Sequence, residues 1–173
     1  MRRPVLLVTV LAAVVVPSVP ASAASQLDVP KTLAKQIKTF KKHSAAKVYL
    51  PSKIGTLGIK PSRIKGTLAV TNGGGYAMEL GVGSNCNGAN ACFVAGFYDT
   101  PGGTPAYKTK VKLRGGLTGY FKKTSCGASC SPAAIEFRVG AGLYEIQSKA
   151  VTQKSEKATM IGLANSALKA GPR

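Results

Sequence analysis

The feature that most constrains the fold is an alternation of apolar and polar residues, with a period of two, that runs from Ile64 to Ala150. Such alternation is typical of strands that bury one face and expose the other. One segment, 92–98, is apolar at almost every position and predicts a strand that is covered on both sides. Glycine-rich turns, as at 72–75 and 114–116, separate the segments. Short strands joined by tight turns pair in antiparallel order, so the middle of the chain predicts an antiparallel meander of about six strands.

The last two strands give the sharpest prediction of register. Apolar residues alternate with polar ones on both sides of Gly140-Ala141-Gly142. A three-residue loop would place Phe137 opposite Glu145 and mix the two faces, because a slip of one residue reverses every side chain. A two-residue turn at Gly140-Ala141 suits type II′ geometry and pairs Phe137 with Tyr144. The alternative turn, Ala141-Gly142, requires a positive φ from alanine, so we favour the first.

Helical periodicity flanks the sheet on both sides. The expected apolar stripes are Leu33, Ile37 and Phe40 in residues 28–42, and Met160, Ile161, Ala164 and Leu168 in residues 155–170. Asp28 and Ser155 are placed to cap the first turns, and Gly171-Pro172 ends the second helix. The chain is therefore predicted to be one α+β domain, with the sheet flanked by an N-terminal and a C-terminal helix.

The first 23 residues have the three parts of an export signal. Two arginines follow Met1, an apolar run extends from Val5 to Val16, and Ala21-Ser22-Ala23 supplies the small residues of a cleavage site. The apolar run is well short of the roughly 20 residues that a membrane-spanning helix needs. We therefore predict a signal peptide, residues 1–23, and a domain, residues 24–173, that has no transmembrane segment and works in the periplasm or outside the cell.

All four cysteines lie after the predicted cleavage point. In an oxidising compartment their even number indicates disulfides, and the spacing favours Cys86–Cys92 and Cys126–Cys130, although crossed pairing stays open. The spacings do not match the C-x2-C pairs of zinc ribbons, and no histidine lies near them. They do not match the redox motif C-x-x-C either. No metal site is predicted.

The chain is strongly basic, with 24 Lys and Arg against six Asp and Glu, for a formal net charge of +18. Four of the cations alternate along one predicted strand: Lys108, Lys110, Lys112 and Arg114. We call these four residues the cationic stripe. Alternate residues of a strand lie roughly 6.6–6.8 Å apart on one face, so the stripe could bind an anionic polymer and release its counterions. The alternative interpretation is that the lysines protect an exposed edge strand from aggregation.

The partner that the cationic stripe fits is an anionic polymer or lipid surface of the cell envelope. Nucleic acid is not expected, because aromatic residues do not interleave with the basic ones for stacking. The domain is expected to be a monomer.

The sequence offers little for catalysis. The single histidine, His43, follows two lysines and has no carboxylate or nucleophile near it in the sequence. The glycine-rich runs match no nucleotide-binding motif, so we predict no cofactor. Asp99 is expected in a turn, where aspartate is common for conformational reasons. Glu136 and Glu145 share the polar face of the last hairpin and form the one carboxylate pair that a glycoside hydrolase could use. We assign no catalytic residue.

Several segments carry a resemblance to known proteins: Leu113-Arg-Gly-Gly-Leu-Thr-Gly-Tyr-Phe121, Cys126-Gly-Ala-Ser-Cys130-Ser-Pro-Ala-Ala-Ile-Glu-Phe137, Gly142-Leu-Tyr-Glu-Ile146 and Ala164-Asn165-Ser166-Ala167. The chain from about Leu50 onward resembles exported bacterial proteins of unassigned function. The resemblance implies bacterial origin, secretion and a compact sheet-plus-helix fold. It supplies no catalytic residue.

These observations predict a secreted, non-catalytic binding or accessory domain that contacts an anionic envelope component through a basic strand face. Two alternatives remain: a secreted hydrolase that uses Glu136 and Glu145, and a carrier that holds a small apolar ligand between the sheet and the helices.

Overall fold

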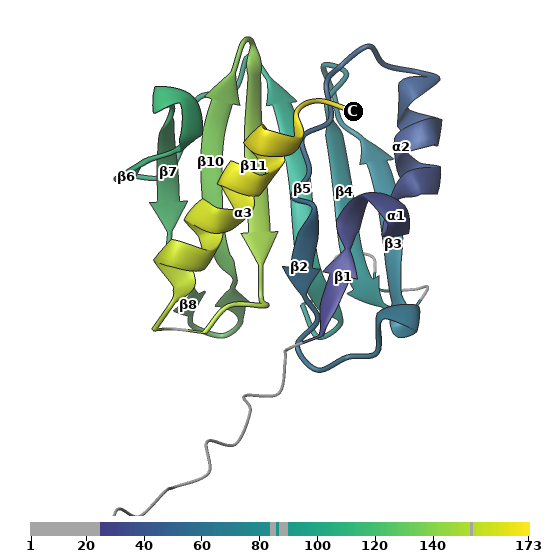
Figure 1. Ribbon diagram of the computed structural model, residues 1–173, viewed down its shortest axis with the longest axis vertical. Coiled ribbons are helices and arrows are strands. Elements are labelled where there is room, and N and C mark those ends of the chain that lie inside the picture. The colour runs from purple at the N-terminus through teal and green to yellow at the C-terminus, as the bar shows by residue number, and fades with distance from the viewer. Residues whose placement is uncertain (1–24, 84–85, 87–89, 153) are drawn as a thin grey trace, which may run out of the picture.

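An antiparallel sheet of seven strands forms the centre of the molecule (Figure 1). The computed structural model describes residues 25–83, 86, 90–152 and 154–173. In spatial order the strands are β3 (Ile64–Val70), β4 (Tyr76–Val82), β5 (Phe93–Pro101), β11 (Gly142–Ser148), β10 (Ala133–Val139), β7 (Thr118–Lys122) and β6 (Thr109–Lys112). The predicted α+β class is confirmed. The order departs from a plain meander after β5, where the chain crosses to the far edge of the sheet and then returns strand by strand to β5.

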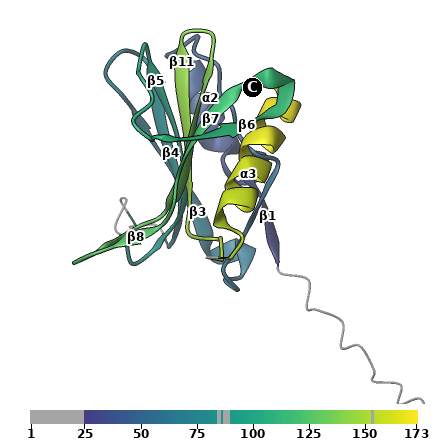
Figure 2. The same ribbon diagram turned by 90° about the vertical axis from the view of Figure 1, so that its left-hand side faces the viewer.

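The remaining elements are short, apart from two helical segments. They are β1 (Gln26–Asp28), α1 (Val29–Thr32), α2 (Ala34–Lys41), β2 (Lys53–Gly55), the 3-10 turns η1 (Pro61–Arg63) and η2 (Arg114–Gly116), β8 (Ser125–Cys126), β9 (Cys130–Ser131) and α3 (Glu156–Ala170). In Figure 1, α3 crosses β10 and β11, α2 lies beside β3, and the β1–β2 pair lies between the helices. We call the side of the sheet under these elements the covered face and the opposite side the polar face. Figure 2 shows the β8–β9 hairpin projecting on the polar side.

The core lies between the sheet and the elements on its covered face. Its central row consists of register partners on five consecutive strands: Met78, Phe97, Ile146, Ile135 and Phe121. All five are buried, and Phe40, Leu50 and Met160 close over them from the other layer. Apolar burial of this extent is the main term that holds the two layers together.

The predicted register of the last hairpin is confirmed. Phe137 pairs with Tyr144, and Val139 pairs with Gly142 across a two-residue Gly140-Ala141 turn. Gly140 has a φ of 60°, which glycine adopts without strain. Sorting of apolar and polar side chains onto opposite faces therefore selected the turn, as the sequence pattern indicated.

The N-terminal helix is kinked rather than continuous. Asp28 caps it as predicted, since its carboxylate accepts a hydrogen bond from the Lys31 amide at 2.8 Å. Leu33, with φ of −96° and ψ of 11°, separates α1 from α2. Of the predicted stripe, Leu33 and Phe40 are fully buried. Gly66 allows the Leu33 side chain to pack closely against β3, because a β-carbon at position 66 would collide with that side chain.

The C-terminal helix begins and ends where predicted, but its buried face is rotated. Gly171 follows α3 with a φ of 74°. Met160 and Ala164 are buried as predicted, whereas Ile161 and Leu168 are only partly buried. Their places are taken by Leu163 and Ala167. The prediction was wrong because alanine and leucine occur all around this helix, so its periodicity defines the buried side poorly.

Two local disulfides are present, as the cysteine spacing favoured. Cys86 is bonded to Cys92, and Cys126 is bonded to Cys130. Disulfides fit a protein that works outside the cytoplasm. The predicted signal peptide, residues 1–23, lies outside the described residues. Within the part of the chain that is described, no helix has the length and apolar character needed to span a membrane.

Candidate functional site

The cationic stripe lies at an edge of the sheet. Lys110 and Lys112 belong to β6, the last strand in the order, while Lys108 precedes this strand and Arg114 opens η2. All four side chains are exposed. Val111, between the two strand lysines, is buried, so Lys110 and Lys112 project on the polar face. The structure thus confirms that all four residues are exposed and that β6 is an edge strand. The prediction that all four alternate along one strand was wrong for Lys108 and Arg114, because β6 is short and the Arg114 amide donates to Asn165 of α3 at 2.7 Å.

Carboxylates on the polar face form hydrogen bonds with neutral groups rather than with the cationic stripe. Glu79 accepts from the Tyr98 hydroxyl at 2.9 Å. Glu145 accepts from the Tyr107 hydroxyl at 2.5 Å and from the Gln147 amide at 2.7 Å. The charge of the stripe therefore remains available to an external anion.

A surface cavity of about 430 Å³ opens beside Lys108. Four lysines from three separate parts of the chain line this cavity: Lys108 before β6, Lys122 and Lys123 at the end of β7, and Lys157 in the first turn of α3. No carboxylate is among the described residues that line it. We call this cavity the basic groove. Four ammonium groups around one cavity attract anions more strongly than the same charges spread over a surface.

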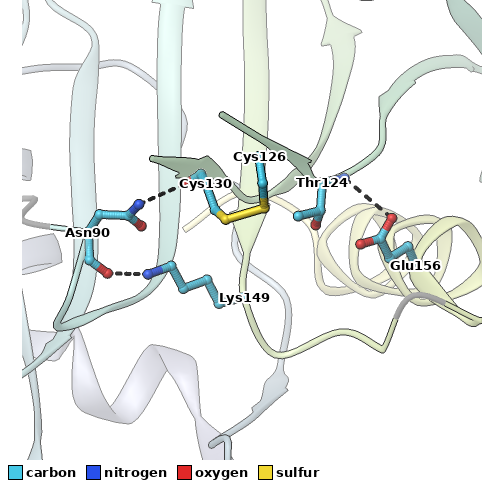
Figure 3. Close-up of a disulfide and its surroundings, with 6 residues drawn as sticks. All are labelled: Asn90, Thr124, Cys126, Cys130, Lys149 and Glu156. Carbon is cyan, nitrogen blue, oxygen red and sulfur yellow. Dashed lines mark hydrogen bonds between the residues drawn. A yellow bond between two sulfur atoms is a disulfide. The ribbon is translucent and has the colours of Figure 1, made fainter. Parts of the chain in front are cut away.

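A second cavity, of about 480 Å³, continues from the basic groove along α3. It shares Phe121, Lys123 and Lys157 with the groove and adds Lys154. Glu156 also lines it, but this carboxylate accepts a hydrogen bond from the Thr124 amide at 3.3 Å (Figure 3). That bond fastens the end of β7 to the start of α3, which brings the lysines of the two elements together.

The connection from β5 to β6, residues 102–108, crosses the polar face and positions Lys108. We call it the strap. Glu136 of β10 holds the strap, since one carboxylate oxygen accepts hydrogen bonds from the amides of Ala106 at 2.8 Å and Tyr107 at 3.1 Å. Arg138 holds it as well, by donating to the Gly103 carbonyl at 2.6 Å. Figure 2 shows the strap running across the polar side toward β6.

Glu136 and Glu145 are direct cross-strand partners, as the hairpin register predicts. Glu136 is only 5% exposed, and burial raises its pKa despite the two amides that favour the charged form. Glu145 is held by Tyr107 of the strap. The geometry therefore makes this pair an anchor of the strap, in which one oxygen of each carboxylate accepts hydrogen bonds from the chain itself.

Tyr107 links the strap to the basic groove. Its hydroxyl donates to Glu145, and the Lys122 ammonium lies 5.5 Å from the centre of its ring, a cation–π contact. Burial and the bond to Glu145 raise the pKa of Tyr107, so it remains a neutral donor. One aromatic ring thus orients one lysine of the groove.

Two other titratable residues, His43 and Asp99, do not line the basic groove. His43 is exposed just beyond α2. Asp99 was predicted to lie in a turn, but it lies within β5, where it is 2% exposed. Burial raises its pKa to about 6, and its Oδ1 has no hydrogen-bond partner among the described residues. The prediction was wrong because β5 continues through the Tyr-Asp-Thr-Pro segment that resembles a turn.

The space between the sheet and the helices is filled by packed side chains. Tyr76, Phe40, Phe97 and Phe137 are the largest of these fully buried residues. Phe40 and Tyr76 make an edge-to-face contact with ring centres 5.3 Å apart. This packing gives no support to a carrier of an apolar ligand at that place.

Comparison with known proteins finds no matching family, no similar curated protein and no similar solved structure. The functional argument therefore depends on the geometry.

Sequence reasoning found Lys108 of the basic groove and missed Lys122, Lys123 and Lys157. The adjacent pair Lys122-Lys123, directly after an apolar strand, was a usable signal. Its significance depends on the position of α3, which the sequence pattern does not give.

Proposed function

We propose that this protein is an exported, non-catalytic binding domain that holds a phosphate-bearing polymer of the bacterial cell envelope in its basic groove. The observation that supports the proposal is the convergence of Lys108, Lys122, Lys123 and Lys157 on one cavity that no described carboxylate lines. The cationic stripe extends this positive surface along β6 and would bind further phosphates of the same chain.

Counterion release supplies the driving force. Each lysine that neutralises a phosphate frees a condensed cation, so affinity grows with the number of contacts and falls as salt rises. The net charge of +18, or +16 once residues 1–23 with their two arginines are removed (18 − 2), adds long-range attraction, which acts over about 10 Å at 0.1 M salt. A concave groove suits a flexible polymer segment better than a flat bilayer, and for this reason we favour the polymer over a lipid surface.

Protection of the sheet edge explains only part of the charge. Lysines on an edge strand discourage pairing with other chains, which accounts for Lys110 and Lys112. It does not account for Lys122, because β7 is paired on both sides, or for Lys157, which belongs to a helix. The lysines of the groove therefore favour a binding role.

The proposal is tested by two triple variants with the same change of net charge. Lys122, Lys123 and Lys157 are replaced by Gln in one variant. In the other, Gln replaces Lys38, Lys41 and Lys42 of the α2 region, which line a different surface cavity. Retention is measured on immobilised poly(glycerol phosphate). The groove variant should lose most of its retention, whereas the α2 variant should keep most of it. Equal retention by the groove variant and the wild type would refute the proposal.

A second arm of the experiment uses vesicles of phosphatidylglycerol. If these vesicles retain the wild type and poly(glycerol phosphate) does not, the ligand is a lipid surface and the polymer proposal is wrong.

A further inference from the structure

We propose that the polar face carries a second and separate site, which binds a small organic ammonium ion. The site is a surface cavity of about 250 Å³ that is lined by residues of β4, β5 and β11, by Asn90 and by the segment from Ser129 to Pro132. The residues that carry the argument are Glu79, Asn90, Phe93, Tyr98, Ser131 and Gln147, all of which line it. The inference does not depend on the proposed function, because the two sites share no residue.

The charge of the cavity is opposite to that of its surroundings. Among the described residues that line it there is no Lys or Arg, and Glu79 supplies a carboxylate. Four other surface cavities each contain at least two Lys or Arg residues. On a chain with 24 such residues, a cavity free of them selects for a ligand of the opposite sign to the one that the basic groove attracts.

Internal hydrogen bonds engage the donor atoms of two amides that line the cavity. The Gln147 amide nitrogen donates to a Glu145 carboxylate at 2.7 Å, and the Asn90 amide nitrogen donates to the Cys130 carbonyl at 2.7 Å. A carboxylate and a carbonyl only accept, so neither amide can be flipped. Each amide therefore has its oxygen left for a ligand. The hydroxyl of Ser131 adds a group that can also accept.

Glu79 is prepared in the same way. The Tyr98 hydroxyl donates to one of its carboxylate oxygens at 2.9 Å, which leaves the other oxygen for the ligand. Burial and the nearby Glu79 raise the pKa of Tyr98, so the phenol stays protonated and keeps this role. Tyr98 can reach Glu79 because its ring lies over Gly96, where a side chain would collide with it.

The described residues at the mouth of the cavity are joined to one another. Asn90 donates a hydrogen bond to Cys130 of the β8–β9 hairpin, which the Cys126–Cys130 disulfide closes (Figure 3). Lys149, which directly follows β11, donates a hydrogen bond from its ammonium group to the Asn90 carbonyl. Lys149 does not line the cavity. A mouth held in this way loses little entropy when a ligand binds.

The chemistry of the lining identifies the ligand class. A carboxylate, two amide oxygens and a hydroxyl match the three donors of a protonated primary amine. The rings of Phe93 and Tyr98 add apolar walls that suit the carbon atoms next to the nitrogen and favour a cation. A cavity of this size holds a group about as large as one amino sugar or one short alkylamine.

The test is a titration of the ¹⁵N-labelled protein, followed by NMR, with two ammonium probes and their neutral counterparts. The probes are n-butylammonium and D-glucosamine, and the counterparts are n-butanol and N-acetyl-D-glucosamine. We expect saturable, millimolar binding of at least one ammonium probe, with the largest shifts in the side-chain amides of Asn90 and Gln147. The counterpart should bind at least about fivefold more weakly. Which probe binds more tightly shows whether the amine is carried by a sugar or by an alkyl chain.

The matched variants are Glu79→Gln, which removes the charge and keeps an acceptor for Tyr98, and Glu156→Gln, which makes the same change outside the cavity. Glu79→Gln should weaken binding of the ammonium probe about tenfold, and Glu156→Gln should not. Neutral compounds that bind as tightly as the ammonium probes, or unchanged affinity in Glu79→Gln, would overturn the inference. Retention of Glu79→Gln on poly(glycerol phosphate) should equal that of the wild type, which separates the two sites.

Discussion

Two neighbouring rows of side chains on the same strands show how differently the two faces of the sheet are used. On the covered face, Met78, Phe97, Ile146, Ile135 and Phe121 are partners in one row and are all buried. At the next register position of the same five strands, the row on the polar face is Ala77, Tyr98, Glu145, Glu136 and Tyr120. The first row contains no polar group, and the second contains two carboxylates, two phenols and a single aliphatic side chain, Ala77.

The comparison teaches that stability and function are assigned to opposite sides of one sheet. Burial of the covered face stabilises the fold without specific chemistry. The polar face holds carboxylates, phenols and ammonium groups at fixed spacings, because packing on the covered face fixes the strands that carry both faces. The strap and the acceptor-lined cavity belong to this polar side, whereas the basic groove opens at the edge of the sheet, where Phe121 and Lys157 of the covered side meet Lys108 and Lys122.

The largest expected effect comes from Phe97 on the covered face. Replacing Phe97 with Ala removes a fully buried ring and should lower the free energy of unfolding by about 3–5 kcal/mol. Replacing the next residue, Tyr98, with Phe removes one hydroxyl and should cost about 1 kcal/mol. Urea unfolding of the two variants measures both values. Equal losses would contradict the division of roles between the faces.

A second test uses Asp99, a carboxylate that the described part of β5 places on the covered face of the sheet. Its pKa is about 6 in the folded chain against 3.8 for the ordinary group, because burial disfavours the charged form. The unfolded chain therefore loses this proton first, and folded stability falls as the pH rises from about 4 to 6 and stays reduced above it. The difference between the two pKa values corresponds to about 3 kcal/mol.

Asp99→Asn should remove this dependence on pH. The free energy of unfolding of the variant minus that of the wild type should be larger at pH 7.5 than at pH 4, by up to about 3 kcal/mol. Urea unfolding of both proteins at both pH values measures this difference. Tyr76 and Tyr144, which lie close to Asp99, have raised pKa values and stay neutral over this range. The same difference between variant and wild type at both pH values would show that Asp99 is not responsible.

The smallest effect is expected at the strap. Glu136→Gln weakens two charge-assisted hydrogen bonds to the Ala106 and Tyr107 amides and should cost about 1 kcal/mol or slightly more. Hydrogen exchange should report faster exchange of these two amides. Glu79→Gln, which changes a polar-face carboxylate that bonds to a hydroxyl, should leave both amides protected. Exchange that is unchanged in Glu136→Gln would mean that the strap is held by other contacts.

The strands and the last hairpin could be predicted from the sequence because a period of two defines which side of each strand is buried. The crossover after β5 could not be predicted, since alternation says nothing of which strands become neighbours. The β1–β2 pair was also missed, because Leu27 and Ile54 stand in segments too short to show a period.

The candidate site was predicted in part for the same reason. The cationic stripe is visible in the sequence, because its four residues alternate within seven positions, although only Lys110 and Lys112 belong to β6. The basic groove gathers Lys122 and Lys157, which are 35 positions apart and meet only because α3 returns to the end of β7. The cavity of the further inference depends on the contact between Asn90 and Cys130, which are 40 positions apart and whose pairing also leaves no trace in the local pattern.

The salt dependence of binding to poly(glycerol phosphate) tests the central claim most directly. The affinities of the wild type, the groove variant and the α2 variant are measured over a series of salt concentrations. If the three groove lysines contact phosphates, the slope of log affinity against log salt should be shallower by about two in the groove variant and unchanged in the α2 variant. The same slope for all three proteins, or equal changes in the two variants, would contradict a specific basic groove.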